Sequence, residues 1–330
     1  MRAKLYQLLR RTLSQDRRNR LKRRIAYMRR RLAPLYRARY GTFGVAELRD
    51  ELARHIPPDA EIVMVHCSLN DLHPMYIGGV RELLDALIDM CGPERTLAMP
   101  AFFFGDLRAD GTGLPFGDLS ACHYYQARPF FDIRRQPSQM GLLSELFRRR
   151  GNVRRSLHPT ASVCALGPLA DALVEGHHLA STSFGEGTPF AFMADRRTAI
   201  VGIGTEYFRC LSQVHAAEDL LGDRYPLVLR PRTIAVQLKD VDGTVHDYKL
   251  RVGEISLHRR AELIERLLGP DELLQWRFHG VPLFVTSAAR VTEVLTEAAL
   301  RGETMYDARP IRAYRALGVK RPTRALVRHR

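Results

Sequence analysis

Hydrophobic positions follow two alternating patterns from about residue 41 onward. Runs of about four to eight apolar and β-branched residues predict buried strands, and longer segments with an apolar residue at every third or fourth position predict helices. Strands that alternate with helices are typical of an α/β fold built in layers. The predicted strands are residues 61–67, 96–104, 160–167, 197–204 and 281–287, and the predicted helices are residues 44–56, 78–91, 138–150, 167–178, 213–222, 258–269 and 289–302.

One pair of segments departs from this alternation. Residues 227–240 and 244–252 are rich in strand-forming residues and flank Asp242-Gly243, a dipeptide that favours the tight turn of a β-hairpin. Because a hairpin adds antiparallel pairing, we expect a mixed, mostly parallel sheet with an added β-hairpin. A segment of about 30 residues without a clear pattern precedes the helix at 138–150, and loops of that length are usually functional.

The net charge of +15 is distributed unevenly along the chain. Residues 1–40 hold 15 Lys and Arg against one acid, and residues 309–330 hold eight against none, so these segments carry +14 and +8. Residues 41–308 therefore carry −7, and a basic nucleic-acid groove in this region is not supported. We divide the chain into a basic amphipathic N-terminal arm (1–40), a main domain (41–308) and a basic C-terminal tail (309–330).

The second half of the N-terminal arm has apolar residues at intervals of three and four, which predicts a basic amphipathic helix. Such a helix can pack on the main domain, or it can contact an anionic membrane surface, an acidic protein or RNA. An organelle transit peptide is a weaker alternative. We favour packing or a partner over a membrane. The apolar positions are Leu21, Ile25, Met28, Leu32, Leu35 and Tyr36.

Several common kinds of functional segment are missing from the sequence. No apolar run approaches the roughly 20 residues of a membrane-spanning helix. There is no P-loop, no GxSxG and no HExxH, and Gly202-Ile203-Gly204 lacks the third glycine of a dinucleotide fingerprint. The cysteines form no CxxC pair, so neither a zinc site nor a disulfide framework is indicated, and the reducing cytoplasm is the simpler compartment. They are Cys67, Cys91, Cys122, Cys164 and Cys210.

Three clusters of polar residues remain as candidates for chemistry. The segment His66-Cys67-Ser68-Leu69 ends a predicted strand, where ligands of open α/β sheets usually bind. A second cluster includes Asp132 and His158, the latter just before another strand. In the third, His215 and Glu218 share one face of a predicted helix. Such a pair can hold an imidazole in the tautomer that a general base needs, and it is equally often a surface ion pair.

Seven short motifs occur in one order between about residues 42 and 230, with fainter similarity to residue 300. They are VMVHCSL, IGGVRELLDAL, ERTLAMPAF, PFFDIRRQPSQMGLLSELFRRR, RRSLHPTASVCALG, FGEGTPFAFM and SQVHAAED. Their order and spacing resemble the aminoglycoside N3-acetyltransferase family. The resemblance implies an α/β/α sandwich and an enzyme that moves an acetyl or other short acyl group from coenzyme A to a substrate amine. In this family the amine attacks directly, no acyl-enzyme forms and no metal is needed.

The resemblance also suggests roles for individual residues. His215 corresponds to the general base, Glu218 and more loosely Glu254 are candidates to orient it, and His158 is a further catalytic candidate. Residues matching the coenzyme A segments are His66, Cys67, Ser68 and Leu69, then Ser138, Met140 and Gly141. Asp132 and Glu186 are candidates for substrate binding, and Glu186 lies in the Gly185–Gly187 motif beside the active site.

Two positions depart from the family pattern. Cys67 stands where the family usually has Ser, and a nucleophilic role for it is a less favoured alternative because buried cysteines are usually inert. His158 stands where aminoglycoside-modifying members more often have Asn, which suggests another kind of amine as substrate.

Two functions therefore stay open at this point. The chain is either an acyl-coenzyme A-dependent N-acyltransferase, in antibiotic modification or specialised metabolism, or a non-catalytic homologue whose basic arms bind RNA, lipid or an acidic carrier protein. The presence of both His215 and Glu218 favours the enzyme. For the arms of the enzyme, we expect recruitment to an acidic carrier protein or an anionic surface.

Overall fold

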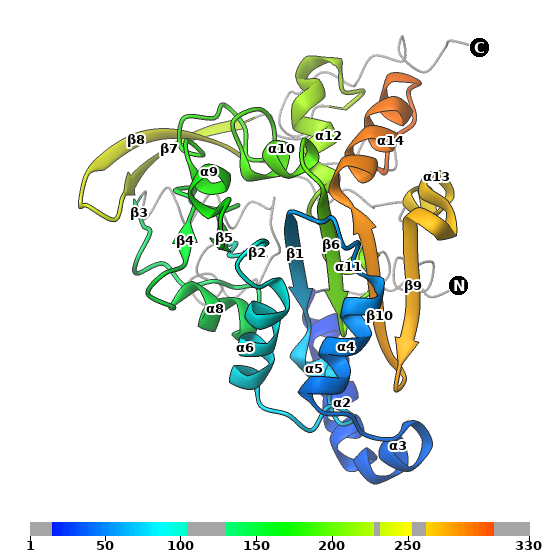
Figure 1. The fold of residues 1–330 in the computed structure, drawn as a ribbon. Helices are drawn as coiled ribbons and strands as arrows, with labels where there is room; N and C mark the ends of the chain where they lie inside the picture. Colours follow the sequence, from blue (N-terminus) through cyan, green and yellow to red (C-terminus); the bar gives the residue numbers. More distant parts are fainter. Residues whose placement is uncertain (1–14, 104–129, 228–231, 253–261, 307–330) are drawn as a thin grey trace.

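The computed structural model describes residues 15–103, 130–227, 232–252 and 262–306. In this part of the chain a seven-stranded sheet has helices on both faces, so the expected α/β sandwich is confirmed (Figure 1). The strands run in the order β4-β5-β2-β1-β6-β10-β9. Their bounds are β1 (Ile62–Cys67), β2 (Thr96–Pro100), β4 (Arg154–Arg155), β5 (Val163–Leu166), β6 (Thr198–Ile203), β9 (Leu273–Phe278) and β10 (Val281–Ser287).

Parallel pairing is confined to the centre of this sheet. Strand β1 is parallel to both β2 and β6, and the four other pairings between the described strands are antiparallel. The expectation of a mixed sheet is confirmed, and the expectation of a mostly parallel one is wrong. One reason is the short connection from β9 to β10 through His279 and Gly280, both with positive φ, because so tight a turn can join only antiparallel strands.

The two faces of the sheet have separate hydrophobic cores. Because side chains alternate along a strand, Ile62 and Met64 of β1 pack on one face and Val63 and Val65 on the other. The first face is covered by α10, α12, α13 and α14, and the second by α4, α6 and α8. These helices are α4 (Val45–His55), α6 (Val80–Cys91), α8 (Leu142–Arg148), α10 (Pro189–Ala194), α12 (Val214–Leu221), α13 (Glu262–Glu272) and α14 (Ala288–Leu300).

The predicted hairpin belongs to a second, smaller sheet with the strand order β3-β7-β8. Strands β7 and β8 pair antiparallel on either side of the turn that holds Gly243, where φ is +96°, so the hairpin is confirmed. Phe131, Leu238 and Leu250 of this sheet form a third core with Phe103 and Leu157. The strands are β3 (Phe130–Asp132), β7 (Arg232–Lys239) and β8 (Val245–Val252).

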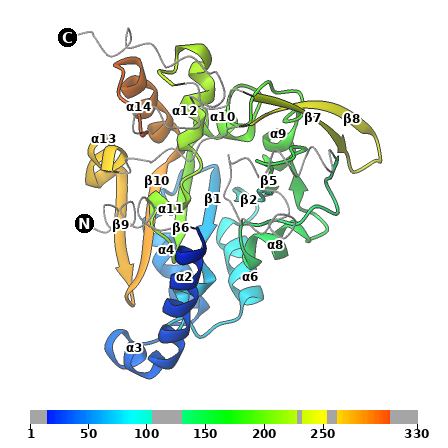
Figure 2. The same ribbon diagram turned by 180° about the vertical axis from the view of Figure 1, so that it is seen from behind.

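Residues 15–40 of the N-terminal arm form two consecutive helices, α2 (Gln15–Arg31) and α3 (Ala33–Tyr40) (Figures 1 and 2). Arg29 of α2 forms an ion pair with Asp71 of α5 (Leu69–Leu72). The helical pattern predicted there is confirmed. No described helix is both long and apolar enough to cross a membrane. The predicted tail at 309–330 and most of the patternless segment after residue 104 lie outside the described residues. The remaining helices are α9 (Ala170–Val174), α11 (Tyr207–Cys210) and the 3-10 turn η1 (Gly222–Arg224).

Candidate active site

The third polar cluster is buried on α12. Nδ1 of His215 lies 2.8 Å from Oε2 of Glu218, and the two residues are 7% and 4% exposed. The alternative of a surface ion pair is therefore wrong. The hydroxyl of Tyr306 donates a hydrogen bond to the other carboxylate oxygen of Glu218. Because a carboxylate only accepts, Nδ1 of His215 carries a proton, and a neutral ring has its lone pair on Nε2.

Packing at the start of α12 fixes the direction of this pair. Val214 and Ala217 pack into the core, and the amide of Gln213 donates to the carbonyl of Phe190 and the hydroxyl of Thr292, each at 2.9 Å. These contacts tie α12 to α10 and α14. Because α10 and α14 both hold α12, the positions of His215 and Glu218 on this helix are fixed.

The loop before α10 lies against the His215 ring. The rings of Phe184 and His215 are 4.9 Å apart, and the backbone N–H of Phe184 donates to Asp219 at 2.9 Å. At Gly185 a Cβ would lie 3.1 Å from the backbone oxygen of Asp219 and closer still to the hydroxyl of Thr182, so a side chain does not fit. The Gly185–Gly187 motif is thus brought beside His215, and Glu186 is exposed there.

The segment at the end of β1 is packed against β6. The N–H of Ser68 donates to the carbonyl of Ile203 at 2.8 Å, and its hydroxyl donates to Asp71 at 2.8 Å. At Gly204, where φ is +68°, a Cβ would come within 2.6 Å of the Ser68 carbonyl, so the backbones approach too closely for a side chain. Leu69 begins α5, which carries Asp71.

His66 and Cys67 lie on opposite faces of β1 because neighbouring side chains alternate. Burial lowers the pKa of His66 to about 4, so its ring is neutral. Burial and the neighbouring Cys210 raise the pKa of the Cys67 thiol to about 12. A thiol protonated at neutral pH is a poor nucleophile, which weighs against the nucleophilic alternative for Cys67.

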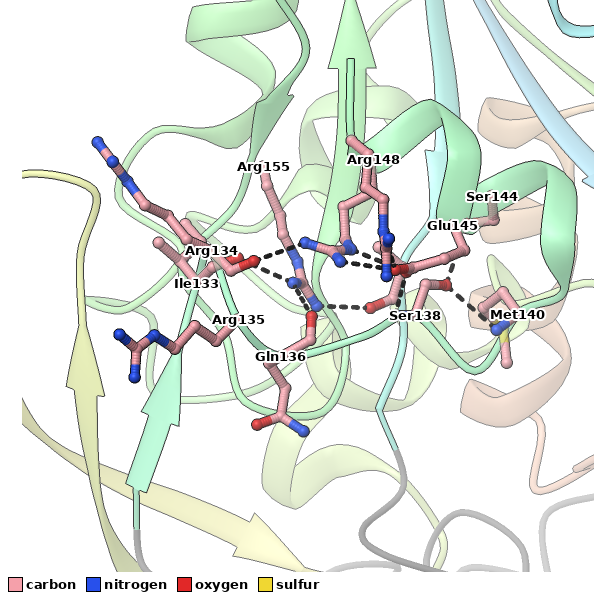
Figure 3. Close-up of polar contacts among 12 residues, drawn as sticks. Ile133, Arg134, Arg135, Gln136, Ser138, Met140, Ser144, Glu145, Arg148 and Arg155 are labelled. Carbon is pink, nitrogen blue, oxygen red and sulfur yellow. Dashed lines mark hydrogen bonds and ion pairs between the residues drawn. The ribbon is translucent and has the colours of Figure 1, made fainter. Parts of the chain in front are cut away.

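The Ser138–Gly141 segment forms a loop before α8 and not the first turn of the helix that was predicted to start at 138. Gly141 has φ of +105°, which ends the loop and lets the helix begin at Leu142. The N–H of Ser138 donates to Glu145 at 2.8 Å, and the Ser138 hydroxyl accepts from the N–H of Met140 at 3.2 Å (Figure 3).

Two arginines hold the chain that leads into this loop (Figure 3). Arg155 donates to the carbonyls of Ile133 and Gln136 at 3.0 and 2.6 Å, and also to the Ala101 carbonyl and the Ser162 hydroxyl. Arg148 donates to Glu145 and to the carbonyl of Arg134. Arg155 lies in the second polar cluster of the sequence analysis, which gave no role to either arginine because no spacing rule shows that a guanidinium will bind backbone carbonyls.

Asp132 has a local structural role at the end of β3. Its Oδ1 accepts the backbone N–H groups of Arg134 and Arg135 at 2.9 and 3.1 Å, which forms the turn after the strand. The side chains of Arg134 and Arg135 are exposed, and in Figure 3 they point away from Ser138 and Met140. The substrate-binding role suggested for Asp132 stays a prediction.

His158 lies in a different buried cluster from His215. Its Nδ1 accepts the backbone N–H groups of Thr160 and Ala161 at 3.2 and 2.9 Å, so the ring proton is on Nε2, which bonds to the hydroxyl of Tyr248 at 3.2 Å. The ring also stacks on His177, with centroids 4.4 Å apart. The partners of His158 named here are thus different from those of the His215–Glu218 pair.

A chain of contacts links the predicted coenzyme segments to His215. A Cβ on Gly141 would lie 3.9 Å from the carbonyl of Cys67, and the N–H of Gln139 donates to the carbonyl of Phe102 at 2.8 Å. The ring of Phe102 lies 6.1 Å from that of Phe184, which contacts His215. The segments at 66–69, 138–141 and 184–187 are thus linked to His215 by a series of contacts.

Two further observations concern metal binding and the candidate Glu254. No group of three or more His, Cys, Asp and Glu among them could bind a metal ion. Glu254, the looser candidate for orienting His215, lies outside the described residues, as does Cys122.

Comparison with protein families matches residues 64–298, more than half of the chain, to the aminoglycoside 3-N-acetyltransferase family. An aminoglycoside N(3)-acetyltransferase III of a Salmonella species is 33% identical over 141 residues, which are 39% of this chain and 44% of that protein. One from Pseudomonas aeruginosa is 29% identical over 191 residues, 57% of this chain and 68% of that protein. The chain thus matches less than half the length of the first relative.

Solved structures with the same fold include two aminoglycoside acetyltransferases. The structure of AAC(3)-Xa has a TM-score of 0.61 at 23% identity and covers 80% of this chain and 95% of that one. A binary complex of AAC-IIIb with CoASH has a TM-score of 0.59 at 22% identity, covering 78% and 98%. At these identities the similarity establishes a shared fold.

Proposed function

Because the chain belongs to the aminoglycoside 3-N-acetyltransferase family, we propose that it transfers an acetyl or other short acyl group from coenzyme A to a substrate amine. The observation that carries this proposal is the buried pair of His215 and Glu218, with Tyr306 on the second carboxylate oxygen. A scaffold protein would gain little from a buried carboxylate that holds a histidine in one tautomer. The non-catalytic alternative is therefore less favoured.

The proposed reaction begins with proton transfer. Most amines are protonated near neutral pH, and the nitrogen needs a lone pair to attack a thioester. In our proposal Nε2 of His215 takes the amine proton, while Glu218 stabilises the resulting imidazolium through Nδ1. The amine nitrogen then bonds to the thioester carbon and the carbon–sulfur bond breaks. The second proton of the nitrogen passes to the coenzyme A thiolate, and the imidazolium of His215 returns its proton to solvent. The products are an amide and free coenzyme A.

The residues near the Ser138–Gly141 loop fit a substrate with several phosphate groups. Arg134 and Arg135 are exposed a few residues before this loop in the sequence, and guanidinium groups bind phosphate oxygens well. Arg155 and Arg148 hold the backbone of the loop in one conformation. We propose that coenzyme A binds along this loop and the 66–69 segment. In this proposal Arg134 and Arg135 bind its phosphate groups, and Arg155 and Arg148 position the loop.

The identity of the amine is a separate proposal. Aminoglycosides are polycations and prefer an acidic surface, and residues 41–308 carry a net charge of −7. The curated relatives are named as aminoglycoside acetyltransferases. We propose an aminoglycoside or another polyamine as substrate, with the exposed Glu186 beside His215 as one of its contacts.

The location of the enzyme and the roles of its arms also belong to the proposal. Cys67, Cys91, Cys164 and Cys210 are all free thiols, which suits the reducing cytoplasm. We keep the division into an arm at 1–40, a domain at 41–308 and a tail at 309–330, and we propose that the two basic segments recruit the enzyme to an acidic carrier protein or an anionic surface.

The direct test is thiol release from acetyl-coenzyme A in the presence of a panel of amines and a metal chelator. We expect amine-dependent release by the wild-type chain and a loss of about 10²–10⁴-fold in His215→Ala, which is the usual contribution of a positioned base. If no amine stimulates release and acetyl-coenzyme A gives no heat in calorimetric titration, the enzyme proposal is wrong. If coenzyme A binds and no amine reacts, the tested amines are the wrong class.

A further inference from the structure

Five apolar side chains of α2 and α3 are exposed, although they follow a helical spacing of four, three, four and three residues. At about 100° per residue this spacing keeps Leu21, Ile25 and Met28 on one side of α2. Leu32 lies at the junction, with φ of −91° and ψ of +11°, and Leu35 lies on α3. Backbone hydrogen bonds from Leu32 to Met28 and from Tyr36 to Leu32 continue the helical path across the junction. We call these five side chains the arm stripe: Leu21 (36% exposed), Ile25 (51%), Met28 (43%), Leu32 (36%) and Leu35 (67%).

The arm is held on the main domain without the arm stripe. Arg29 forms an ion pair with Asp71 at 2.6 Å, Arg37 donates to the Pro74 carbonyl at 3.0 Å, and His279 donates to the Tyr40 carbonyl at 2.6 Å. Of the apolar positions that define the predicted amphipathic face, only Tyr36 packs against the core beside α4. Of the contacts considered for this face, packing on the main domain therefore does not apply to the arm stripe, and contact with something outside the chain remains.

The charged residues around the arm stripe indicate what kind of partner can cover it. Arg20, Arg24, Arg30 and Arg31 are exposed on the same helix, and Asp16 is the single acid among residues 1–40. A second copy of the chain would bring two sets of arginines together, which is unfavourable. A helix with an exposed apolar side and many arginines, in contrast, has the composition of a helix that lies flat on a negatively charged lipid surface.

We propose that α2 and α3 bind the enzyme peripherally to a membrane rich in anionic lipid. In this arrangement the arm stripe enters the boundary between headgroups and acyl chains, and the arginines bind the headgroup phosphates. Figure 1 shows α3 and α12 near opposite ends of the molecule. The His215–Glu218 pair on α12 therefore stays on the side away from the lipid.

The test is sedimentation of the full chain with vesicles of phosphatidylcholine, with and without phosphatidylglycerol. We expect binding only to the anionic vesicles, and weaker binding as added salt shortens the Debye length from about 10 Å toward 3 Å. The variant Ile25→Gln/Leu35→Gln should bind about ten-fold less tightly or weaker still, because it removes two large apolar side chains. Arg20→Gln/Arg24→Gln should lose about five-fold per arginine.

Matched controls change the same residue types on exposed positions of the main domain. Val241→Gln/Val245→Gln and Arg81→Gln/Arg251→Gln should bind like wild type. The proposal is overturned if the full chain ignores anionic vesicles, if the arm-stripe variant binds as well as wild type, or if that variant instead abolishes a self-association seen by sedimentation velocity. Turnover of a soluble amine without vesicles should be equal in all variants, so failure of the proposed activity is recognised separately.

Discussion

The sharpest prediction concerns the carboxylate behind His215. In Glu218→Gln the side chain keeps its shape and loses its charge. Glu218 now accepts two hydrogen bonds, from Nδ1 of His215 at 2.8 Å and from the hydroxyl of Tyr306. An amide has one acceptor oxygen and one donor nitrogen, so only one of these partners can keep its bond. If the amide oxygen faces His215, the amide nitrogen can donate to the Tyr306 hydroxyl, which turns to accept. If the amide nitrogen faces His215, the imidazole must move its proton from Nδ1 to Nε2.

The second outcome removes the base, because a proton on Nε2 leaves no lone pair to take the proton of the amine. We therefore expect turnover to fall by about 10²–10⁴-fold, the usual contribution of general base catalysis. The first outcome keeps the lone pair on Nε2, but a neutral amide does not stabilise an imidazolium as the buried carboxylate does, so turnover should fall there as well. Tyr306→Phe removes one hydrogen bond and keeps the carboxylate, so its effect on turnover should be much smaller.

The assay combines pre-steady-state thiol release with urea unfolding of each variant. A matched control is Glu51→Gln, which alters a buried carboxylate that accepts from Trp276 at 2.8 Å. It should lower the unfolding free energy and leave turnover of the folded protein unchanged. If Glu218→Gln is folded and keeps turnover within ten-fold of wild type, the reasoning from the tautomer of His215 is refuted.

Three other predictions concern the groups around this pair. Arg155→Lys should raise the KM for acetyl-coenzyme A more than it lowers kcat, because an ammonium cannot reach the four oxygens that the guanidinium binds, and steady-state kinetics measures this. Tyr248→Phe should lower the unfolding free energy by about 1–3 kcal/mol in urea titrations, because the buried Nε2 of His158 loses its acceptor. Burial raises the pKa of Glu145, but hydrogen bonds, chiefly from Arg148, lower it to about 2. Because the folded-state pKa lies below the ordinary 4.5, this stabilisation is complete above pH 4.5 and is lost as the pH falls toward 2, so the stability gap between wild type and Glu145→Gln should close over that range.

Much of the fold could be predicted because helix and strand periods differ strongly in the main body. The predicted strand at 61–67 and helix at 78–91 correspond to β1 and α6 within one or two residues. Strand β9 was missed, because as an edge strand it mixes apolar with exposed polar residues and lacks the continuous apolar run of a buried strand. The pairing direction of β10 depends on that missed neighbour, which explains why the sheet was expected to be mostly parallel.

In the candidate site, too, some contacts could be predicted from the sequence and others could not. The spacing of His215 and Glu218 predicted a shared helix face, because residues three positions apart are neighbours on the surface of a helix. Tyr306 is 88 residues away from Glu218, and Arg155 reaches Ala101 across 54 residues. Contacts of this kind depend on how the sheet and loops pack, and no local pattern contains them.

Two of the buried histidines, His215 and His158, show why burial and residue type alone do not identify a base. In His215 the Nδ1 proton points at a carboxylate, so a proton gained on Nε2 makes an imidazolium beside a negative charge. In His158 the Nδ1 lone pair already accepts two backbone N–H groups, and Nε2 already bears the ring proton. A second proton on His158 would have to point at those N–H groups and break both bonds. The direction of the hydrogen bonds thus favours His215 as the base and a positioning role for His158.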